Sequence, residues 1–250
     1  MAERVIHLPD DEYVAVIARS EELARLEAQV RKRKSMLVFG PEGVGKTRLL
    51  QTFAKTQPYS LYVPHLRNPK DTLQALFEGL RALKKRELRL PESTRSLSTP
   101  SLKGIVRRAL TEFPFVLVLD HVAGPSRVVT GLIKDFSDYD QRSIIFAARS
   151  PHMEDIGALQ PMCADRSERL ELKNLPAPIA LEFARQEAIR AGVEARNLEA
   201  TLHSIVEWSG GNPGGILRML KMARMEKYRT EDQVKAHVLH LDFLMGTQKA

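Results

Sequence analysis

The chain has 250 residues, enough for one large domain or two modest ones, each with a buried core. Hydrophobic residues make up 43% of it and charged residues 28%, a globular balance that excludes the disordered and fibrous classes. The net charge of +7 favours anionic partners but does not distinguish nucleotides from nucleic acids or acidic proteins.

The first two thirds of the chain alternate between short apolar runs and stretches with helical spacing. The apolar runs predict five strands, at residues 35–40, 59–63, 115–119, 143–148 and 169–172. The stretches between them predict helices at 21–33, 45–55, 71–84, 102–112 and 127–136, the third of them capped by Asp71. Continuous apolar strands between helices are typical of a parallel sheet covered on both faces, so we expect a doubly wound α/β domain.

The pattern changes after residue 174, where helices are predicted at 179–191, 198–208 and 214–225 and no strand is predicted. Residues 231–244 form one more amphipathic stretch, with Val234, Val238, Leu241 and Leu244 at helical spacing. We therefore expect an α/β domain over 1–174, a small helical domain over 175–226 and an amphipathic tail over 227–250. The polar segment 84–100 is expected to be an exposed loop.

A phosphate-binding motif follows the first predicted strand. Gly40-Pro-Glu-Gly-Val-Gly-Lys-Thr47 matches G-x-x-x-x-G-K-[ST] in full, between a strand and a helix. Such a loop gathers backbone N–H groups at the positive end of a helix and so binds anions. Lys46 would reach the β- and γ-phosphates of a nucleotide, and the hydroxyl of Thr47 would hold Mg²⁺. The alternative, a glycine-rich turn without a ligand, does not explain the complete motif.

Asp120 ends the most apolar predicted strand, where a carboxylate is costly unless it meets a cation. Beside a complete phosphate loop it is expected to hold the Mg²⁺ shell, and the alternative role is a helix cap. Proteins with such a loop that hydrolyse nucleotides rapidly usually have an acidic residue after this aspartate, and that residue polarises the attacking water. This chain has His121 at that position. His121 is a candidate catalytic residue or a packing residue, and the missing acid predicts slow hydrolysis.

Several segments together resemble the AAA+ ATPases, particularly their STAND branch of signalling ATPases. Gly40–Leu50 resembles the family's P-loop, Ile17–Leu23 its N-terminal box, and Phe115–His121 its Walker B strand. Ile144–Ser150 is similar to its sensor 1 strand, and Gly210-Gly-Asn-Pro-Gly214 to its lid motif. The resemblance implies a P-loop NTPase three-layer α/β/α fold with strand order 5-1-4-3-2, followed by a small all-α lid.

The resemblance also implies a nucleotide site for ATP or ADP with Mg²⁺. Its cofactor-binding residues would be Ile17, Arg19, Gly40, Pro41, Glu42, Gly43, Val44, Gly45, Lys46, Thr47, Arg48, Asn212 and Pro213. Arg149 would lie between Lys46 and Asp120 and read the γ-phosphate, unless it is a surface arginine at a strand end. The chain departs from the family in having Ala18 before Arg19, and Arg127, Arg142 and Arg166 are the candidates for an arginine finger.

These features predict a slowly hydrolysing ATPase that acts as a nucleotide-dependent switch. No effector domain is recognised after the lid, so the output is expected in trans, through ATP-stimulated self-association or a separate effector protein. The alternative is a DNA-associated AAA+ regulator, similar to replication initiators or transposase-directing ATPases. A metabolic kinase is disfavoured because the Gly-Asn-Pro lid is unlike a substrate lid.

Basic clusters support the alternative. Aromatic residues do not interleave with them, so contact with duplex phosphates is favoured over stacking on single strands. They lie at Arg31–Lys34, Lys84–Arg86 with Arg89, Arg107–Arg108, and Arg218, Lys221, Arg224 and Lys227.

The same sequence predicts a cytoplasmic protein. Its longest apolar stretch, Phe113–Leu119, is far shorter than the ~20 residues of a membrane span. The N-terminus lacks the apolar core of a signal peptide, and one cysteine, Cys163, cannot form an internal disulfide.

Overall fold

The computed structural model describes residues 19–66, 68–83, 90–91, 97–112, 114–137 and 142–247. They divide into two compact units. The sheet unit comprises Arg19–Pro41 and Lys46–Leu172. The helical unit comprises Glu42–Gly45 and the described part of Lys173–Ala250.

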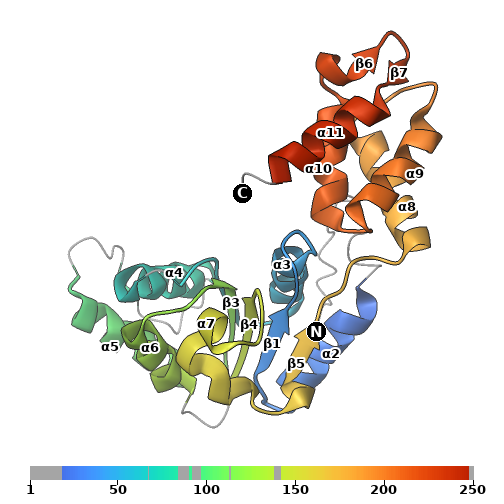
Figure 1. Cartoon of the computed structure of the whole chain (residues 1–250). Coiled ribbons are helices and arrows are strands. Elements are labelled where there is room, and N and C mark those ends of the chain that lie inside the picture. The colour runs from blue at the N-terminus through green and yellow to red at the C-terminus, as the bar shows by residue number, and fades with distance from the viewer. Residues whose placement is uncertain are drawn as a thin grey trace, which may run out of the picture. The chain divides into compact units, whose positions relative to one another are not determined.

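The sheet unit is built on five parallel strands in the order β2-β3-β4-β1-β5 (Figure 1). This confirms the order 5-1-4-3-2 and the α/β/α fold of P-loop NTPases. Every residue of β4 and all of β3 except His121 are buried, as expected for strands covered on both faces. The strands are β1 (Met36–Phe39), β2 (Ser60–Val63), β3 (Val116–Val122), β4 (Ser143–Ala148) and β5 (Arg169–Glu171).

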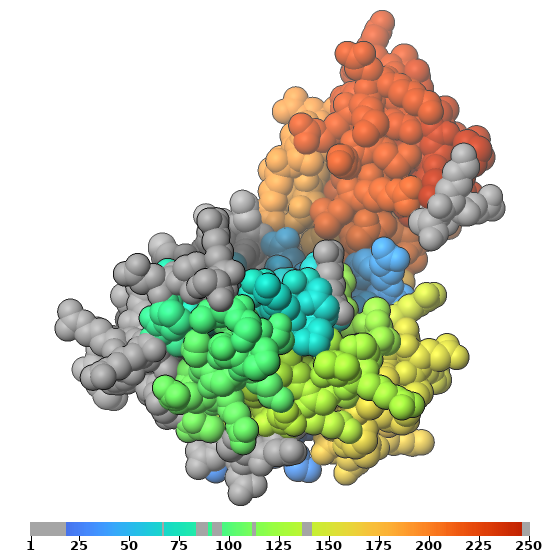
Figure 2. All heavy atoms as spheres, turned by 90° about the vertical axis from the view of Figure 1, so that its left-hand side faces the viewer, coloured from blue at the N-terminus to red at the C-terminus, as the bar shows by residue number. Residues whose placement is uncertain are grey.

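The helices of this unit pack as two groups, α2 with α3, and α4 with α5 and α6. Figure 2 shows the second group side by side on one face of the unit. Leucine, valine and phenylalanine side chains from α4, α5 and α6 and from the sheet form one buried core. The helices are α2 (Ser20–Arg31), α3 (Lys46–Thr56), α4 (Pro69–Ala82), α5 (Thr99–Glu112), α6 (Arg127–Ser137) and the short α7 (Met153–Ile156), followed by 3₁₀ turns η1 (Gly157–Cys163) and η2 (Arg166–Glu168).

The N-terminus of α4 differs from the prediction, because Asn68 and not Asp71 is its cap. The Asn68 side chain accepts a hydrogen bond from the backbone N–H of Asp71 at 2.9 Å, and Pro69 occupies the first turn. Pro69 fits there because its missing N–H would have no partner within the helix. Asp71 therefore lies inside the first turn, where its carboxylate accepts from the Asn68 amide at 2.7 Å.

The helical unit contains α8 (Ala177–Arg190), α9 (Leu198–Ser209), α10 (Pro213–Ala223) and α11 (Ala236–Thr247) around a second buried core. Between α10 and α11 lie the 3₁₀ turn η3 (Glu226–Tyr228) and an antiparallel pair of two-residue strands, β6 (Arg229–Thr230) and β7 (Gln233–Val234). The prediction that no strand follows residue 174 is therefore wrong. Two residues per strand are too few to produce a recognisable alternation in the sequence.

The described part of the segment predicted as a tail, 227–250, is an integral element of this unit. Tyr228, Val234, Leu239 and Phe243 are buried in its core. The predicted apolar face was wrong in its other three residues, since Val238, Leu241 and Leu244 are 40%, 61% and 46% exposed. Because α11 is apolar around much of its circumference, spacing alone does not identify the face that packs.

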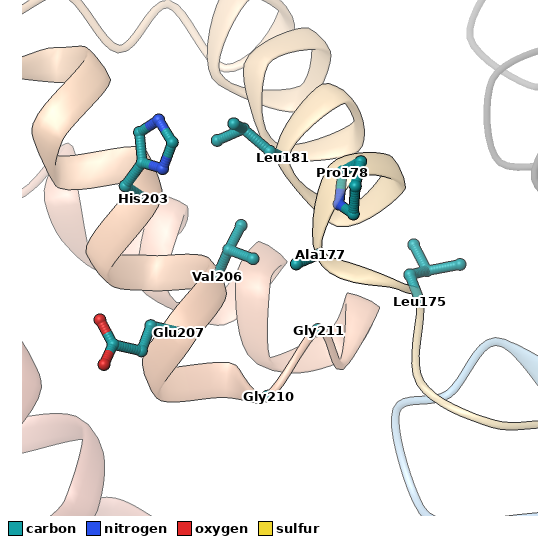
Figure 3. Close-up of a pocket in the computed structure, with 9 residues that line it drawn as sticks. All are labelled: Leu175, Ala177, Pro178, Leu181, His203, Val206, Glu207, Gly210 and Gly211. Carbon is teal, nitrogen blue, oxygen red and sulfur yellow. The ribbon is translucent and has the colours of Figure 1, made fainter.

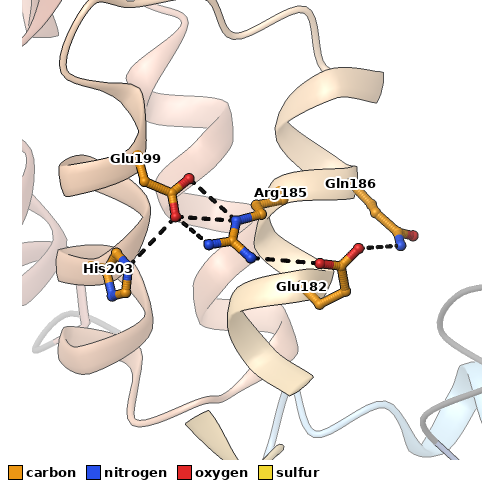
Figure 4. Close-up of polar contacts among 5 residues, drawn as sticks. All are labelled: Glu182, Arg185, Gln186, Glu199 and His203. Carbon is orange, nitrogen blue, oxygen red and sulfur yellow. Dashed lines mark hydrogen bonds and ion pairs between the residues drawn. The ribbon is translucent and has the colours of Figure 1, made fainter. Parts of the chain in front are cut away.

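An ion-pair network links α8 to α9 on the surface of the helical unit (Figure 4). The Arg185 guanidinium donates to both carboxylate oxygens of Glu199, at 3.1 and 3.2 Å from Nε, and also pairs with Glu182. The hydrogen bond from Arg185 lowers the pKa of Glu199. The side chains are solvent-exposed, so the network contributes little to the free energy of unfolding.

Among the described residues, no helix combines the length and apolar character that crossing a membrane requires.

Candidate functional site

The loop between β1 and α3 has the backbone that the phosphate motif requires. Gly43 and Gly45 have φ of +75° and +101°, a region that side chains with a Cβ disfavour. Val44 between them is buried, which anchors the loop while Pro41, Glu42 and Gly43 stay exposed. The Lys46 ammonium donates to the carbonyls of Gly40 at 2.7 Å and Pro41 at 2.9 Å. The lysine charge is thus held at the loop itself.

Asp120 lies at the carboxyl end of β3 and is 1% exposed. Its Oδ1 accepts from the backbone N–H of His121 at 2.8 Å, and its Oδ2 accepts from the Tyr62 hydroxyl at 2.8 Å. Both donors are uncharged, so the carboxylate charge stays available to a cation. Together with the Thr47 hydroxyl, this acidic group fits a Mg²⁺ shell, because Mg²⁺ takes oxygen ligands and water.

Tyr62 was not identified from the sequence. It comes from β2, which pairs with β3 in a register that sets Tyr62 opposite Val118. Burial, and then the hydrogen bond to Asp120, raise the pKa of Tyr62 well above its ordinary value, so the phenol stays a donor. The sequence shows only a polar side chain near the end of a strand, and this does not identify the residue that the side chain contacts.

His121 turns toward the start of α3. Its φ of +48° is in the left-handed region, and the β3–β4 register shifts between Leu119 and Val122 around it. Its Nε2 lies 3.2 Å from the Thr47 Oγ1 and 3.7 Å from the Asp120 Oδ2. The ring of His65, also not identified from the sequence, packs against it with centroids 5.0 Å apart. The structure therefore brings the side chains of Thr47, Asp120 and His121 together.

Arg149 directly follows β4, which lies between β1 and β3. Its carbonyl accepts from the N–H of Gly40 at 3.2 Å, and this bond ties the first residue of the loop to the neighbouring strand. The side chain is exposed. Its predicted contact with a γ-phosphate stays a prediction.

The remaining predicted residues are spread over other elements or lie outside the described part of the chain. Ile17 lies outside the described residues. Arg19 precedes α2 and pairs with Glu22 at 2.8 Å, and Arg48 is half-buried in the first turn of α3. Arg142 is no arginine finger, because it is buried and donates to the carbonyl of Phe136 at 2.9 Å. The other two candidates, Arg127 and Arg166, are exposed.

The Gly-Asn-Pro motif and residues 42–45 contact each other within the helical unit. The Asn212 amide donates to the Glu42 carbonyl at 2.9 Å, and its oxygen caps α10 by accepting from Gly215 N–H at 3.0 Å. The N–H of Gly214 donates to the Gly43 carbonyl at 2.9 Å. A Cβ on Gly43 would lie 2.5 Å from Asn212 Oδ1, so a side chain there would break this contact. Pro213 occupies the first turn of α10.

A pocket of about 670 Å³ opens between α8 and α9 in the helical unit (Figure 3). Its lining is mainly apolar, with His203 and Glu207 as the polar side chains. Gly210 and Gly211, just before Asn212, form one end of it. An apolar lining of this kind does not suit a phosphate group.

The described basic clusters are exposed, while 84–86 and Arg89 lie outside the described residues. Arg31 ends α2 and residues 32–34 follow it, and Arg107 and Arg108 lie on α5. On and after α10, the exposed basic residues are Arg218, Lys221, Arg224 and Lys227. Lys227 is paired with Asp242.

Residues 29–151 match the family model described as an AAA domain. No curated protein sequence matches the chain significantly. Among solved structures it is similar to Orc1 of Aeropyrum pernix in complex with DNA, with a TM-score of 0.64 at 16% identity over 90% of this chain and 65% of that one. The chain thus spans less than two thirds of that protein's structure.

Two further structures are similar. The Walker-type ATPase paby2304 of Pyrococcus abyssi has a TM-score of 0.63 at 17% identity, over 92% of this chain and 74% of that one. Domain III of the replication initiation protein DnaA of Thermotoga maritima has a TM-score of 0.53 at 19% identity, over 93% and 95% of the two chains. At these identities the likeness shows the fold alone.

Proposed function

This chain carries an AAA-type P-loop domain in residues 29–151, and we propose that it binds ATP with a divalent cation and acts as a slowly hydrolysing, nucleotide-dependent switch. The observation that carries the proposal is the convergence of three groups on one edge of the sheet. The Lys46 ammonium lies against the loop, the Thr47 hydroxyl lies in the first turn of α3, and the buried Asp120 lies near the carboxyl end of β3.

In this proposal the loop from Gly40 to Gly45 and the first turn of α3, through Arg48, hold the phosphates. Lys46 exchanges its two carbonyl partners for β- and γ-phosphate oxygens, which accept more strongly because they are charged. Thr47 and Asp120 hold Mg²⁺, which neutralises charge on the phosphates. Ile17, Arg19, Asn212 and Pro213 contact the nucleotide from outside the loop, and Arg149 contacts the γ-phosphate.

Slow hydrolysis follows from the residue after Asp120. A carboxylate at that position would draw a proton from the attacking water, and an imidazole already directed at Thr47 does so less effectively. A wild-type protein that hydrolyses many ATP molecules per second would contradict this part of the proposal.

The binding experiment compares Lys46→Ala with wild type by calorimetric titration with Mg²⁺·ADP and Mg²⁺·ATP. Removing a charged donor to phosphate is expected to weaken binding by at least about tenfold. Lys70→Ala, which removes an exposed lysine from α4, is the matched control and should bind like wild type. Equal affinity of Lys46→Ala and wild type would refute the assignment of the loop.

The output of the switch is proposed to be self-association stimulated by ATP, or capture of a separate effector protein. A nucleotide changes the conformation of such a domain because it binds one of two conformations more tightly than the other. Mass measurement in solution with ADP and with a non-hydrolysable ATP analogue tests self-association. Identical masses in both states would leave only the effector protein as the output.

A second candidate function is binding of duplex DNA. It is favoured by the exposed cations Arg218, Lys221 and Arg224 on and after α10, and by the structural likeness to an Orc1 that was solved with DNA. Binding through phosphates should weaken steeply with salt, by about 0.9 in the log–log slope for each contact. Changing all three residues to Glu should abolish duplex binding at 50 mM salt. The absence of binding by wild type under these conditions would reject this function.

A further inference from the structure

We propose that this chain self-associates head to tail, with the exposed face of α10 on one copy docked into the pocket between α8 and α9 on the next copy. The inference rests on the proposed function and names the two surfaces through which its self-association occurs. It is carried by an open apolar pocket, an apolar and basic helix face, and the opposite charges of the two.

One surface is the exposed face of α10. Leu217, Lys221 and Arg224 are exposed, and at 3.6 residues per turn they fall within about 60° of one another around the helix axis. Met225, just beyond the helix, adds a second exposed apolar side chain. Within the described part of the chain neither Lys221 nor Arg224 forms an ion pair. This face therefore combines apolar side chains with two cations.

The other surface is the pocket between α8 and α9. Apolar side chains line it, among them Ala177, Leu181 and Val206, and its volume of about 670 Å³ has room for several side chains of a partner (Figure 3). An open cavity of this size and lining is typical of a binding site. Glu207 also lines it, and among the described residues the Glu207 carboxylate forms no ion pair. The pocket therefore suits an apolar side chain with a cation beside it.

The charge around the pocket is negative. His203 lines the pocket and also lies 3.5 Å from Glu199, so the ion-pair network continues from the pocket along the surface of α8 and α9 (Figure 4). Glu182 and Glu199 share one guanidinium, that of Arg185. With histidine counted as neutral, three carboxylates including Glu207 and one guanidinium leave two negative charges, whereas the α10 face carries two positive ones. Such complementary patches favour encounter in one orientation.

The two surfaces cannot meet within one copy. The opposite side of α10, with Ile216, Met219 and Leu220, is buried in the core that α10 shares with α8 and α9. A second copy presents the matching face, and the aliphatic stem of its Lys221 can lie along the apolar lining while its ammonium reaches Glu207. A contact between two different patches is heterologous, so the copy at each end keeps one surface free and the assembly can grow.

The proposed phosphate loop is bonded to the segment that joins these surfaces. The N–H of Gly214, in the first turn of α10, donates to the Gly43 carbonyl at 2.9 Å. The Asn212 side chain donates to the Glu42 carbonyl at 2.9 Å, and Gly210–Gly211 line the end of the pocket. A nucleotide that moves the loop can therefore shift both surfaces, and we expect association to differ between ADP and ATP.

Sedimentation equilibrium of the full chain tests the two surfaces, with Mg²⁺ and a non-hydrolysable ATP analogue, at about 50 μM protein because small interfaces bind weakly. Wild type is expected to exceed the mass of two chains. Lys221→Glu sets like charges opposite each other and Ala177→Trp fills the pocket, and each alone should weaken association by at least about tenfold. Lys70→Glu makes the same change of net charge on α4 and, as the matched control, should associate like wild type.

An equimolar mixture of the two variants tests whether the contact is heterologous. Ala177→Trp keeps its α10 face and Lys221→Glu keeps its pocket, so one intact contact can form and assembly should stop at two chains. The double variant Lys221→Glu/Glu207→Lys exchanges the two charges and should regain self-association. A mixture or a double variant that keeps the mass of one chain refutes the contact.

Other outcomes also decide against the inference. Wild type that binds both nucleotides in the calorimeter but keeps the mass of one chain refutes it and leaves nucleotide binding intact. If Lys221→Glu associates like wild type but loses duplex DNA, the α10 cations serve DNA and not a second copy. Failure of wild type to bind either nucleotide refutes the proposed function, and this inference falls with it.

Discussion

Replacing Tyr62 with phenylalanine removes one hydroxyl and tests whether β2 supports the acidic group of the site. The hydroxyl donates to Asp120 Oδ2 at 2.8 Å, and the Asp120 side chain is 2% exposed. In Tyr62→Phe the carboxylate keeps, among the described residues, one hydrogen-bond donor, the backbone N–H of His121. The ring itself stays, so the variant removes only the hydroxyl, which besides its bond to Asp120 accepts a long hydrogen bond from the Gln51 amide at 3.5 Å.

The magnitude follows from the charge and burial of the acceptor. A hydrogen bond to a charged group contributes about 1.5–3 kcal/mol to folding. Tyr62 is only half-buried, so water can enter and partly replace the hydroxyl. We therefore expect the free energy of unfolding to fall by about 1.5–2 kcal/mol, the lower part of that range. For a chain of this size that corresponds to a Tm lower by roughly 3–8 °C.

Urea unfolding followed by circular dichroism, without nucleotide, measures the change. Tyr228→Phe is the matched control, since its hydroxyl donates to a carboxylate oxygen of Asp242 at 2.9 Å. Asp242 is 20% exposed and also pairs with Lys227, so this variant should lose only about 0.5–1 kcal/mol. A loss in Tyr62→Phe no larger than in Tyr228→Phe, at equal m-values, would show that Tyr62 does not stabilise the Asp120 carboxylate.

Three further predictions concern stability. The pKa of Tyr62 is raised by burial and by the neighbouring carboxylate, so above pH 10.0 the unfolded chain loses this proton first. Stability should then fall as the pH rises through the alkaline range, less steeply in Tyr62→Phe, and parallel pH profiles would contradict this. Asn68→Ala removes the cap of α4 and should cost about 1 kcal/mol in thermal unfolding, whereas Asn68→Asp should retain most of it. Arg142→Met leaves the carbonyls of Phe136 and Leu110 without their guanidinium donor, and urea unfolding should show a loss of about 2 kcal/mol or more; a loss below 0.5 kcal/mol would contradict this.

The phosphate loop could be predicted because all of its determinants are contiguous in the chain. The three glycines with positive φ, Gly40, Gly43 and Gly45, lie with the lysine and the threonine within eight residues, between a strand and a helix. The strand order followed from the family resemblance that this loop and four other segments carry. The sheet confirms that order, in which β3 and β4 lie side by side between β2 and β1. Asp120 near the end of β3 and Arg149 directly after β4 therefore lie on neighbouring strands.

The helices and strands themselves were easier to predict than the face on which a helix packs or the residue that a side chain contacts. The α11 helix buries Leu239 and exposes Leu241, although Leu241 and not Leu239 belongs to the face that the spacing predicted to pack. Which one packs depends on where α9 and α10 lie against α11, information that a single segment does not contain. The cap of α4 shows a local version of this limit, since Asn68 and Asp71 are both good capping residues and only the backbone conformation of Asn68 decides.

The sequence by itself determined a nucleotide-type loop, an acidic strand end and a histidine in place of an acid. Only the tertiary structure decided that Tyr62 holds Asp120, that His65 packs on His121, and that His121 faces Thr47. The physical reason is that β2, β3 and the start of α3 meet through strand pairing and packing between residues far apart in the chain. Local spacing encodes each element, whereas the pairing register and the positive φ of His121 set the distances on which the chemistry depends.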